Sequence, residues 1–254
     1  MASMTRRSFL LSSATIPVAC AMNRGSVPPE RAAGLRAPNL GQSWRYAKHD
    51  LISRALVDVE MDRIAAVGKT IDIDSRTEGS ETKASSPSSF WGTNWLRRYF
   101  DRAKPSMVLP SEVQAPWGMV LVDPHWNHVQ VYEAPIPLWP TELVPGWHSH
   151  IRSKYKTAES DNEMRWEQTM KAETWETVSV PAGQFKALRY INDISFRDAD
   201  PARTDSKRRE TIWFAPEVGR WVARESAGQY YLDDSVDDQP HNESGYRWEL
   251  LEWM

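Results

Sequence analysis

Cysteine is almost absent from this sequence, which contains a single one among 254 residues. One cysteine can form neither a disulfide framework nor a cysteine-based zinc cluster. Long hydrophobic runs are missing too, because no stretch reaches the ~18 apolar residues that a membrane-spanning helix needs. Basic charge is not in excess: the formal net charge is −3, and scattered lysines and arginines form no footprint for nucleic acid. The composition therefore excludes a multi-span membrane protein, and we expect no nucleic-acid partner.

The motifs of the common enzyme classes are also absent. The chain has no G-x-S-x-G, no H-E-x-x-H, no glycine-rich phosphate loop and no dinucleotide fingerprint. Ser80–Lys83 matches the S-x-x-K of penicillin-recognising enzymes, and Ser160–Asn162 matches their S-D-N. We discard this match, because no K-T-G follows and Ser80 lies in a polar, turn-like stretch. The motifs thus predict no cofactor and no catalytic residue.

Histidines are the best remaining candidates for metal or acid–base chemistry. His125 and His128 lie three positions apart, and His148 and His150 lie two positions apart. Side chains at positions i and i+2 of a strand share a face, so such a pair can chelate one zinc ion if a third ligand approaches. Exposed histidines on tryptophan-rich strands are the simpler interpretation. A metal-dependent hydrolase is therefore only our second alternative function.

The first 21 residues have the features of a twin-arginine export signal. Arg6 and Arg7 precede the apolar stretch Phe9–Ala19, and no acidic residue occurs before Glu30. Polar residues interrupt this short stretch, which makes it too weak for a permanent membrane anchor. We predict export to the periplasm.

The single cysteine lies at the end of this signal. Val18-Ala19-Cys20 resembles the end of a lipoprotein processing box, although Pro17 stands where that box usually carries an aliphatic residue. Ordinary signal cleavage before Met22 fits the same residues. Because the only cysteine occupies this position, we favour acylation of Cys20. Its acyl chains would hold the protein on a membrane face.

From residue 42 onward, apolar and polar residues alternate with the period of half-buried strands. Residues 22–41 are rich in proline and glycine and predict an extended linker. Ser88–Lys104 is a candidate amphipathic helix, weakened by a glycine. We predict a mainly β body over residues 42–254, a curved antiparallel sheet or half-open barrel with at most one or two short helices. The alternating runs are Val57–Asp62, Ile71–Asp74, Val120–Val122, Val129–Val131, Phe185–Ile191, Ile212–Phe214 and Tyr246–Trp253.

The body shows a hint of internal duplication. Gly41–Trp44 and Gly146–Ser149 each open a run of strands, which continues into a charged alternating stretch and a turn glycine. Two similar halves, residues 42–140 and 141–254, would fit this pattern. Chance alignment of tryptophan-rich strand sequences would produce the same few matches.

Two motifs near the C-terminal end predict tight turns. Val178–Phe185 reads V-S-V-P-A-G-Q-F, in which Pro181 sets φ and Gly183 permits a positive φ. Thr211–Val222 reads T-I-W-F-A-P-E-V-G-R-W-V, a strand that ends before a turn into the next antiparallel strand. These residue types define a fold and need no chemistry to explain them.

Together with a last strand containing Glu249-Leu250, the two motifs resemble a group of bacterial envelope domains of uncharacterised function. That group is similar in shape to the curved, half-open sheets of periplasmic lipoprotein carriers such as LolA and LolB. The resemblance covers residues 176–250 and implies a fold and a compartment. It transfers no catalytic residue to this chain.

Tryptophan is abundant, with 13 residues against six phenylalanines. Aromatic side chains join a large apolar surface to a polar handle, so they suit a concave sheet face that stays open to a ligand. Filling of an ordinary β core is the commoner role of such residues. The candidate ligand-binding residues are Trp117, Trp126, Trp139, Trp147, Trp166 and Trp213.

We therefore predict a non-enzymatic exported envelope protein, a lipoprotein that binds an apolar small molecule, a lipid or another envelope component on its aromatic face. The first alternative is a periplasmic scaffold that docks partner proteins through an exposed sheet edge. A continuous apolar cavity would favour the binding protein, and a flat or filled sheet with a free edge would favour the scaffold. Clustering of the four histidines would favour the hydrolase.

Overall fold

The computed structural model describes residues 35–78, 112–126, 128–158, 160–233 and 239–254. Every regular element in these ranges is a β-strand. The predicted helix over Ser88–Lys104, the export signal over residues 1–21 and Cys20 lie outside them. Within the described residues, no helix has the length and apolar character needed to cross a membrane.

The strands are longest between residues 160 and 232. Their bounds are β1 Ser43–Asp50, β2 Leu56–Val67, β3 Ile71–Glu78, β4 Glu112–Gln114, β5 Met119–Asp123, β6 Gln130–Pro137, β7 His148–Thr157, β8 Ser160–Val180, β9 Gly183–Arg197, β10 Arg203–Ala215, β11 Arg220–Leu232, β12 His241–Asn242 and β13 Tyr246–Trp253.

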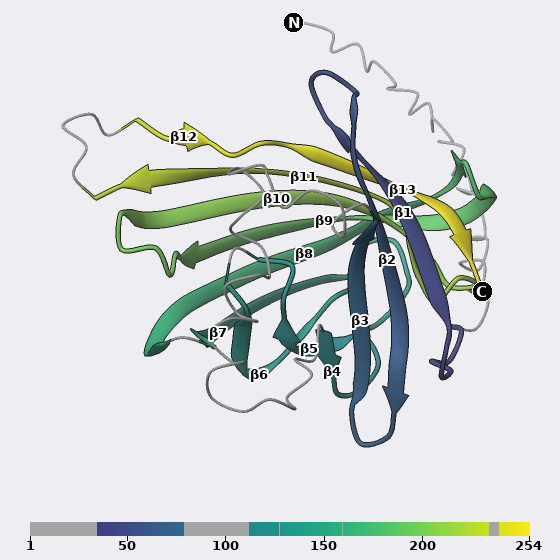
Figure 1. Ribbon diagram of the computed structural model, residues 1–254, viewed down its shortest axis with the longest axis horizontal. Helices are drawn as coiled ribbons and strands as arrows, with labels where there is room; N and C mark the ends of the chain where they lie inside the picture. The colour runs from purple at the N-terminus through teal and green to yellow at the C-terminus, as the bar shows by residue number, and fades with distance from the viewer. Residues whose placement is uncertain (1–34, 79–111, 127, 159, 234–238) are drawn as a thin grey trace, which may run out of the picture. The chain divides into compact units, whose positions relative to one another are not determined.

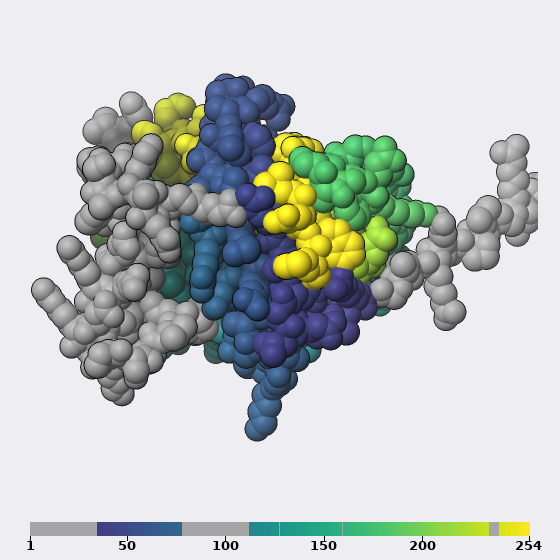
Figure 2. Space-filling view, turned by 45° about the vertical axis from the view of Figure 1, so that its right-hand side comes forward, coloured from purple at the N-terminus to yellow at the C-terminus, as the bar shows by residue number. Residues whose placement is uncertain are grey.

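All these strands belong to one antiparallel sheet that closes on itself. From β1 to β11, each strand pairs with the next along the chain, and the long strands β8 to β11 lie side by side in Figure 1. The last strand, β13, inserts between β11 and β1 and so completes a ring of twelve strands, with the short β12 added on β11. Figure 2 shows β13 (yellow) against β1 (purple), although the two are the most distant strands in the sequence. The predicted mainly β, curved antiparallel fold is confirmed, and the sheet closes fully.

The alternation of side chains along the strands explains which face is buried. In β8, Trp166, Gln168 and Met170 are buried, while the residues between them are more exposed. In β9, the same alternation buries Tyr190 and Phe196. Because neighbouring side chains of a strand point to opposite faces, one row faces the interior of the ring and the other faces outward.

The two predicted turns connect strands of the second half as expected, and both also hold the terminal strands. In the β8–β9 turn, the backbone N–H of Ala182 donates to the carbonyl of Leu250 in β13. In the β10–β11 turn, the carbonyl of Val218 accepts a hydrogen bond of 3.1 Å from the indole N–H of Trp44 in β1. Gly219 has a φ of +74° there, and a Cβ at this position would lie 3.2 Å from Arg36. The turns therefore fix the strands that close the ring.

The described end of the predicted linker, residues 35–41, contacts the sheet. The backbone N–H of Arg36 donates to the carbonyl of Pro216 at 2.9 Å, and its guanidinium lies 4.8 Å from the ring centre of Trp253. Residues 35–41 of the predicted linker thus belong to the folded body.

The pairing between β6 and β7 is the shortest between ring neighbours in the second half of the chain. These strands pair only over Gln130–Tyr132 and Tyr155–Thr157, so the remaining part of β7 pairs with β8 alone among the described strands. The predicted boundary between halves 42–140 and 141–254 falls in the connection between these two strands. The duplication itself stays a prediction, since the sheet runs continuously from one half to the other.

Candidate functional site: a charged cavity lined by tryptophans

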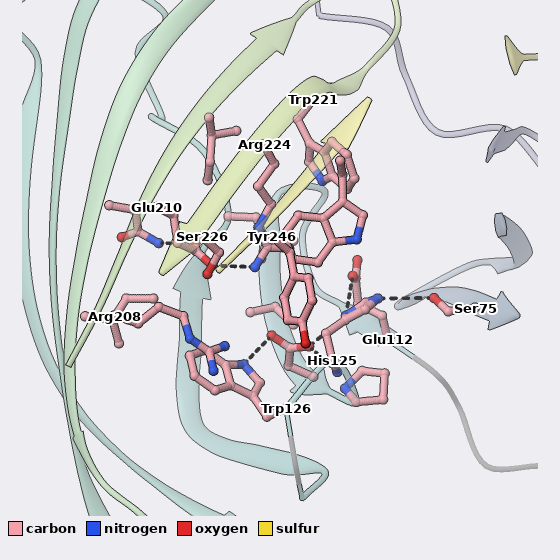
Figure 3. A pocket seen from close by; sticks show the side chains of 18 of the residues that line it. Ser75, Glu112, His125, Trp126, Arg208, Glu210, Trp221, Arg224, Ser226 and Tyr246 are labelled. Carbon is pink, nitrogen blue, oxygen red and sulfur yellow. Dashed lines mark hydrogen bonds and ion pairs between the residues drawn. The ribbon is translucent and has the colours of Figure 1, made fainter. Parts of the chain in front are cut away.

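A cavity of about 480 Å³ lies inside the ring of strands. Five tryptophans and three tyrosines contribute to its wall, together with ionisable side chains of both signs. Figure 3 shows Ser75, Glu112 and His125 on one side of it and Glu210, Arg208 and Trp126 on the other. Its volume falls within the ~300–1,000 Å³ typical of small-molecule sites.

Arg220, the first residue of β11, is the centre of the first charged group. Its side chain is only 4% exposed and reaches across the interior, where Nη2 lies 3.0 Å from Asp62 Oδ2 of β2 and 3.1 Å from Glu112 Oε2 of β4. The guanidinium also lies 5.2 Å from the ring centre of Trp44. Burial alone would lower the pKa of Arg220. The negative charges of Glu112 and Asp62 outweigh this effect and raise the pKa above its ordinary value. Arg220 is therefore a permanent cation that joins three strands.

His125 follows β5 and continues this network. Its Nδ1 lies 2.8 Å from Asp123 Oδ1 and 3.6 Å from Glu112 Oε2. Burial would lower the pKa of His125, but the hydrogen bond and charge of Asp123, with the charges of Glu112 and Asp62, outweigh it and raise the pKa to about 9. Burial would raise the pKa of Asp123, but its bonds to His125 and Trp126 lower it to about 2. At neutral pH the pair is an imidazolium beside a carboxylate.

Ser75 of β3 completes a serine–histidine–aspartate arrangement with this pair. Its Oγ lies 3.2 Å from His125 Nε2, a distance compatible with a nucleophile and its base. However, the Ser75 hydroxyl donates to Asp62 Oδ1 at 2.6 Å, and a protonated His125 has no lone pair on Nε2 to take its proton. In this protonation state, His125 donates to Ser75, and the arrangement acts as a hydrogen-bonded support for the carboxylates.

A second charged group lies on the long strands β9, β10 and β11. Arg224 forms a short ion pair with Glu210, and Asn192 Nδ2 donates to the other oxygen of Glu210 at 3.1 Å. The guanidinium of Arg224 lies 5.1 Å from the ring centre of Trp248 on β13. Glu210 is thus held by two partners at the wall of the cavity.

Several buried polar atoms of these groups have no hydrogen-bond partner in the described residues. They are Oδ1 of Asn192 and Nε of both Arg220 and Arg224, and all three residues line the cavity. Buried polar atoms are nearly always hydrogen-bonded to protein, water or ligand. Each of the three atoms has less than 1 Å² of accessible surface, so it lies within the packed wall and not on the surface of the cavity.

The six predicted tryptophans divide into two sets. Trp126, Trp139 and Trp166 line the cavity, and Trp126 meets Trp166 edge to face at 5.1 Å while it donates to Asp123. The other three contribute to packing outside the cavity wall: Trp117, Trp147 and Trp213. Trp221 and Trp248, which the sequence interpretation did not select, also line the cavity.

The predicted histidine ligands do not form a metal site in the part of the chain that the structure describes. No group of three or more His, Cys, Asp or Glu side chains there is arranged to hold a metal ion. His125 belongs to the cavity network, whereas His148 and His150 lie on the exposed face of β7, where Nδ1 of His150 is 2.9 Å from Thr169 Oγ1. His128 lines a small hollow next to Trp126. The two predicted histidine pairs therefore lie on different surfaces of the protein and do not come together.

Sequence reasoning missed six polar residues of the site, five of them charged. The missed residues are Asp62, Glu112, Asn192, Glu210, Arg220 and Arg224. A signal was present, since Asp62 stands two positions before buried Ile64 and Glu210 stands two before buried Ile212. Polar residues in register with the buried row of a strand point into the interior. Their partners across the ring could not be inferred from such a pattern.

Comparisons with known proteins found no matching family model and no matching curated sequence. A proposed lipoprotein from Parabacteroides distasonis has a TM-score of 0.45 and 12% identity over 89% of this chain and 100% of its own. A proposed exported protein with a YmcC-like fold from Bacteroides fragilis has a TM-score of 0.35 and 11% identity over 88% of this chain and 100% of its own. Export and lipoprotein character are said of those two proteins, and similarities this low carry no conclusion about this chain.

Proposed function

We propose that this chain is an exported, non-enzymatic envelope protein that binds a small molecule with both polar and apolar parts inside its ring of strands. The observation that carries the proposal is a cavity of about 480 Å³ whose wall combines five tryptophans and three tyrosines with paired charges of both signs. Ligand sites are commonly apolar clefts in which a few polar groups fix orientation. Here the polar groups are unusually many.

The charged residues of the wall restrict the kinds of molecule that the cavity can bind. An apolar molecule that filled the cavity would remove water from buried ionic and amide groups without replacing its hydrogen bonds, which is unfavourable. The sequence interpretation proposed an apolar ligand. A molecule with both polar and apolar parts fits this wall better than a purely apolar one.

Native mass spectrometry of the full chain, purified from the membrane of its own cells, tests this proposal. We expect a bound mass on the wild-type protein, which the Asn192→Leu variant loses. The matched control, Ser195→Leu, places the same side chain on the opposite face of β9 and should keep the bound mass. A protein that carries no bound mass under these conditions would contradict ligand binding.

Export and anchoring rest on the N-terminal sequence alone. The paired arginines support twin-arginine export, and Cys20 supports a lipid anchor. Replacing Arg6 and Arg7 by lysine should retain the protein in the cytoplasm, and Cys20→Ser should release it from the membrane fraction and remove the added acyl mass. Unchanged fractionation of both variants would contradict the predicted compartment.

A hydrolase is the alternative that the Ser75–His125 contact keeps open to test. A fluorophosphonate probe labels activated serines, and we expect it to leave Ser75 unmodified at neutral pH because His125 is protonated there. Labelling that disappears in Ser75→Ala would instead support a hydrolase. One observation supports the scaffold alternative: residues 148–154 of β7 pair with β8 alone among the described strands, which leaves a free edge there.

A further inference from the structure

We propose that the free edge of β7 binds an extended acidic segment of a partner protein, which adds to the sheet as a further strand. The free edge is residues 148–154, which pair with β8 and with no other strand in the described part of the chain. This site is separate from the cavity and does not depend on a cavity ligand. Its backbone, its exposed charges and its half-buried residues each restrict the partner.

Backbone hydrogen-bonding groups of the free edge face away from β8. On one side of β7, the N–H of Ala172 in β8 donates to the carbonyl of Trp147 at 2.8 Å. On the other side, the N–H of Ala158 donates to the carbonyl of Val129, next to β6, at 3.1 Å. Because the backbone groups of successive residues point in opposite directions, the odd-numbered residues of β7 face β8. The N–H and C=O groups that face away from it belong to His148, His150, Arg152 and Lys154.

Prolines in β6 explain why that strand does not continue the pairing. The ladder between β6 and β7 ends at Tyr132, and Pro135 and Pro137 follow in β6. The N–H of Leu138 donates to the carbonyl of Gly118 at 2.8 Å and so faces β5, which means that the position of Pro137 faces β7. Proline has no N–H to donate to a ladder. The sequence of β6 therefore leaves the edge of β7 without a partner among the described strands.

The exposed side chains of the free edge are all basic residues or histidines, namely His148, His150, Arg152 and Lys154. Carboxylates of β8 offset part of this charge: Glu167 lies 3.6 Å from Arg152, and Glu163 lies 2.7 Å from Lys154. Further cations stand on the same outward face at Lys156 and Lys171, so an excess of positive charge remains. Opposite charges on neighbouring strands attract, which favours an acidic partner.

The same row of side chains disfavours a second copy of this chain as the partner. If two free edges paired, in either direction, basic residues or histidines of one copy would lie opposite those of the other. Like charges directly opposite each other destabilise a strand pair, and lysine on an edge strand is a common protection against such association. A strand with glutamate or aspartate in the facing row would instead form ion pairs with the edge.

The other row of the free edge restricts the second half of the partner's pattern. Ser149, Ile151 and Ser153 are half-buried, and Ile151 packs against a core cluster that contains Ile136 and Trp166. A strand added to β7 would place alternate side chains beside this row. Small or apolar residues fit there, because a charged side chain would lose water without gaining a partner. The proposed partner is therefore an extended segment in which acidic residues alternate with small or apolar ones.

Binding of fluorescent peptides to the full chain, measured by anisotropy, tests the proposal. The probe is a peptide as long as the free edge in which glutamate and valine alternate. One control peptide has lysine in place of glutamate, and a second keeps the glutamates but is methylated on its backbone nitrogens. We expect saturable binding of the probe alone, because the first control reverses the charge and the second cannot donate backbone hydrogen bonds.

Two further measurements locate the binding. Reversing the charge of the edge with Arg152→Glu and Lys154→Glu should weaken probe binding by roughly tenfold or more. The matched control, Lys69→Glu with Lys207→Glu, makes the same change of charge at exposed positions outside β7 and should leave binding unchanged. In the wild-type chain, which needs no variant to fold, bound probe should slow amide hydrogen exchange at His148, His150, Arg152 and Lys154.

Each opposite result overturns the proposal. Absence of probe binding would exclude the acidic strand as partner. Equal binding of the methylated peptide would mean a charge contact without strand pairing, and equal binding of the lysine peptide would contradict the role of charge. Slower exchange at another edge alone would exclude β7. None of these results affects the proposed cavity ligand, which native mass spectrometry tests separately.

Discussion

Arg220 illustrates how single residues organise the interior. Its buried guanidinium meets carboxylates from β2 and β4, two strands that are not its neighbours in the sheet. A buried ion pair contributes little net stability compared with an apolar replacement of both partners, but removing one partner leaves the other charge unpaired. Arg220 therefore matters mainly because Asp62 and Glu112 are present.

The first prediction concerns Arg220→Leu. This variant leaves two buried carboxylates without their cation, and we expect the free energy of unfolding to fall by about 3–5 kcal/mol. Urea denaturation followed by circular dichroism measures it. The control is Arg152→Leu, which breaks an exposed ion pair to Glu167 and should cost ~0–1 kcal/mol. Equal losses in the two variants would contradict the role given to Arg220.

The second prediction concerns the protonation of His125. Its pKa is about 9 in the folded chain and 6.5 in the unfolded chain, so between these values the folded state holds a proton that the unfolded state has released. The contribution of His125 to stability should therefore be fully present below pH 6.5 and decrease as the pH rises toward 9. One proton changes the free energy by at most about 1.4 kcal/mol per pH unit.

His125→Gln should flatten this part of the pH profile, because glutamine does not titrate. Urea unfolding at pH 6, 7.5 and 9 measures the profile for both proteins. The matched variant His150→Gln changes an exposed histidine of β7 and should keep the wild-type slope. Parallel profiles for wild type and His125→Gln would show that another group releases the proton.

At the scale of elements, the closing strand β13 connects the two ends of the meander. It pairs with β1 over most of its length and with β11 over Ala223–Ser226. The β8–β9 turn also holds it through the hydrogen bond from Ala182 to Leu250. The buried row of β13 includes Trp248 and Leu250, so packing and backbone pairing stabilise the same strand.

The third prediction compares adjacent leucines of this strand. Leu250 is fully buried in a core cluster that also contains Trp44 and Val222, and truncation to alanine should lower the free energy of unfolding by about 2–5 kcal/mol. Leu251 lies where the pairing of β13 with β1 shifts register and is less buried than Leu250, so Leu251→Ala should cost clearly less. Guanidinium denaturation of both variants measures the difference. A reversed order would contradict the inward position of Leu250.

At the scale of the whole molecule, the core clusters are connected. Trp117 packs against two of the three clusters, and Leu138 also packs against two. Glycine is required at position 118 beside Trp139 of the third cluster, because a Cβ there would lie 2.6 Å from the ring of Trp139. A closed ring and a shared core favour unfolding as one unit, even though β6 and β7 pair over a short stretch.

The fourth prediction follows from this connectivity. The full chain should unfold in urea in a single transition, with coincident midpoints by tryptophan fluorescence and far-ultraviolet circular dichroism. Two separated transitions would instead support independent halves over residues 42–140 and 141–254. Leu138→Ala, which loosens the contact between clusters, should be the first variant to separate the two signals.

The sequence by itself determined the strands, because alternation and turn residues are local properties. The runs at Ile71–Asp74 and Phe185–Ile191 lie in strands, and the turns before Gly183 and at Gly219 lie where proline and glycine predicted them. Phe185, which opens the second of these runs, is buried. Such features depend only on neighbours in the chain.

Only the tertiary structure decided that the sheet closes and what the closed ring contains. Closure brings Trp44 beside Trp253, and it sets Arg220 against Asp62 and Glu112. No local pattern encodes these partners, since strand pairing between distant segments and contacts across an interior depend on the path of the whole chain. Three of the tryptophans that line the cavity could therefore be named from the sequence. The charged residues that line it with them could not, because they come together only when β13 pairs with β1 and closes the ring.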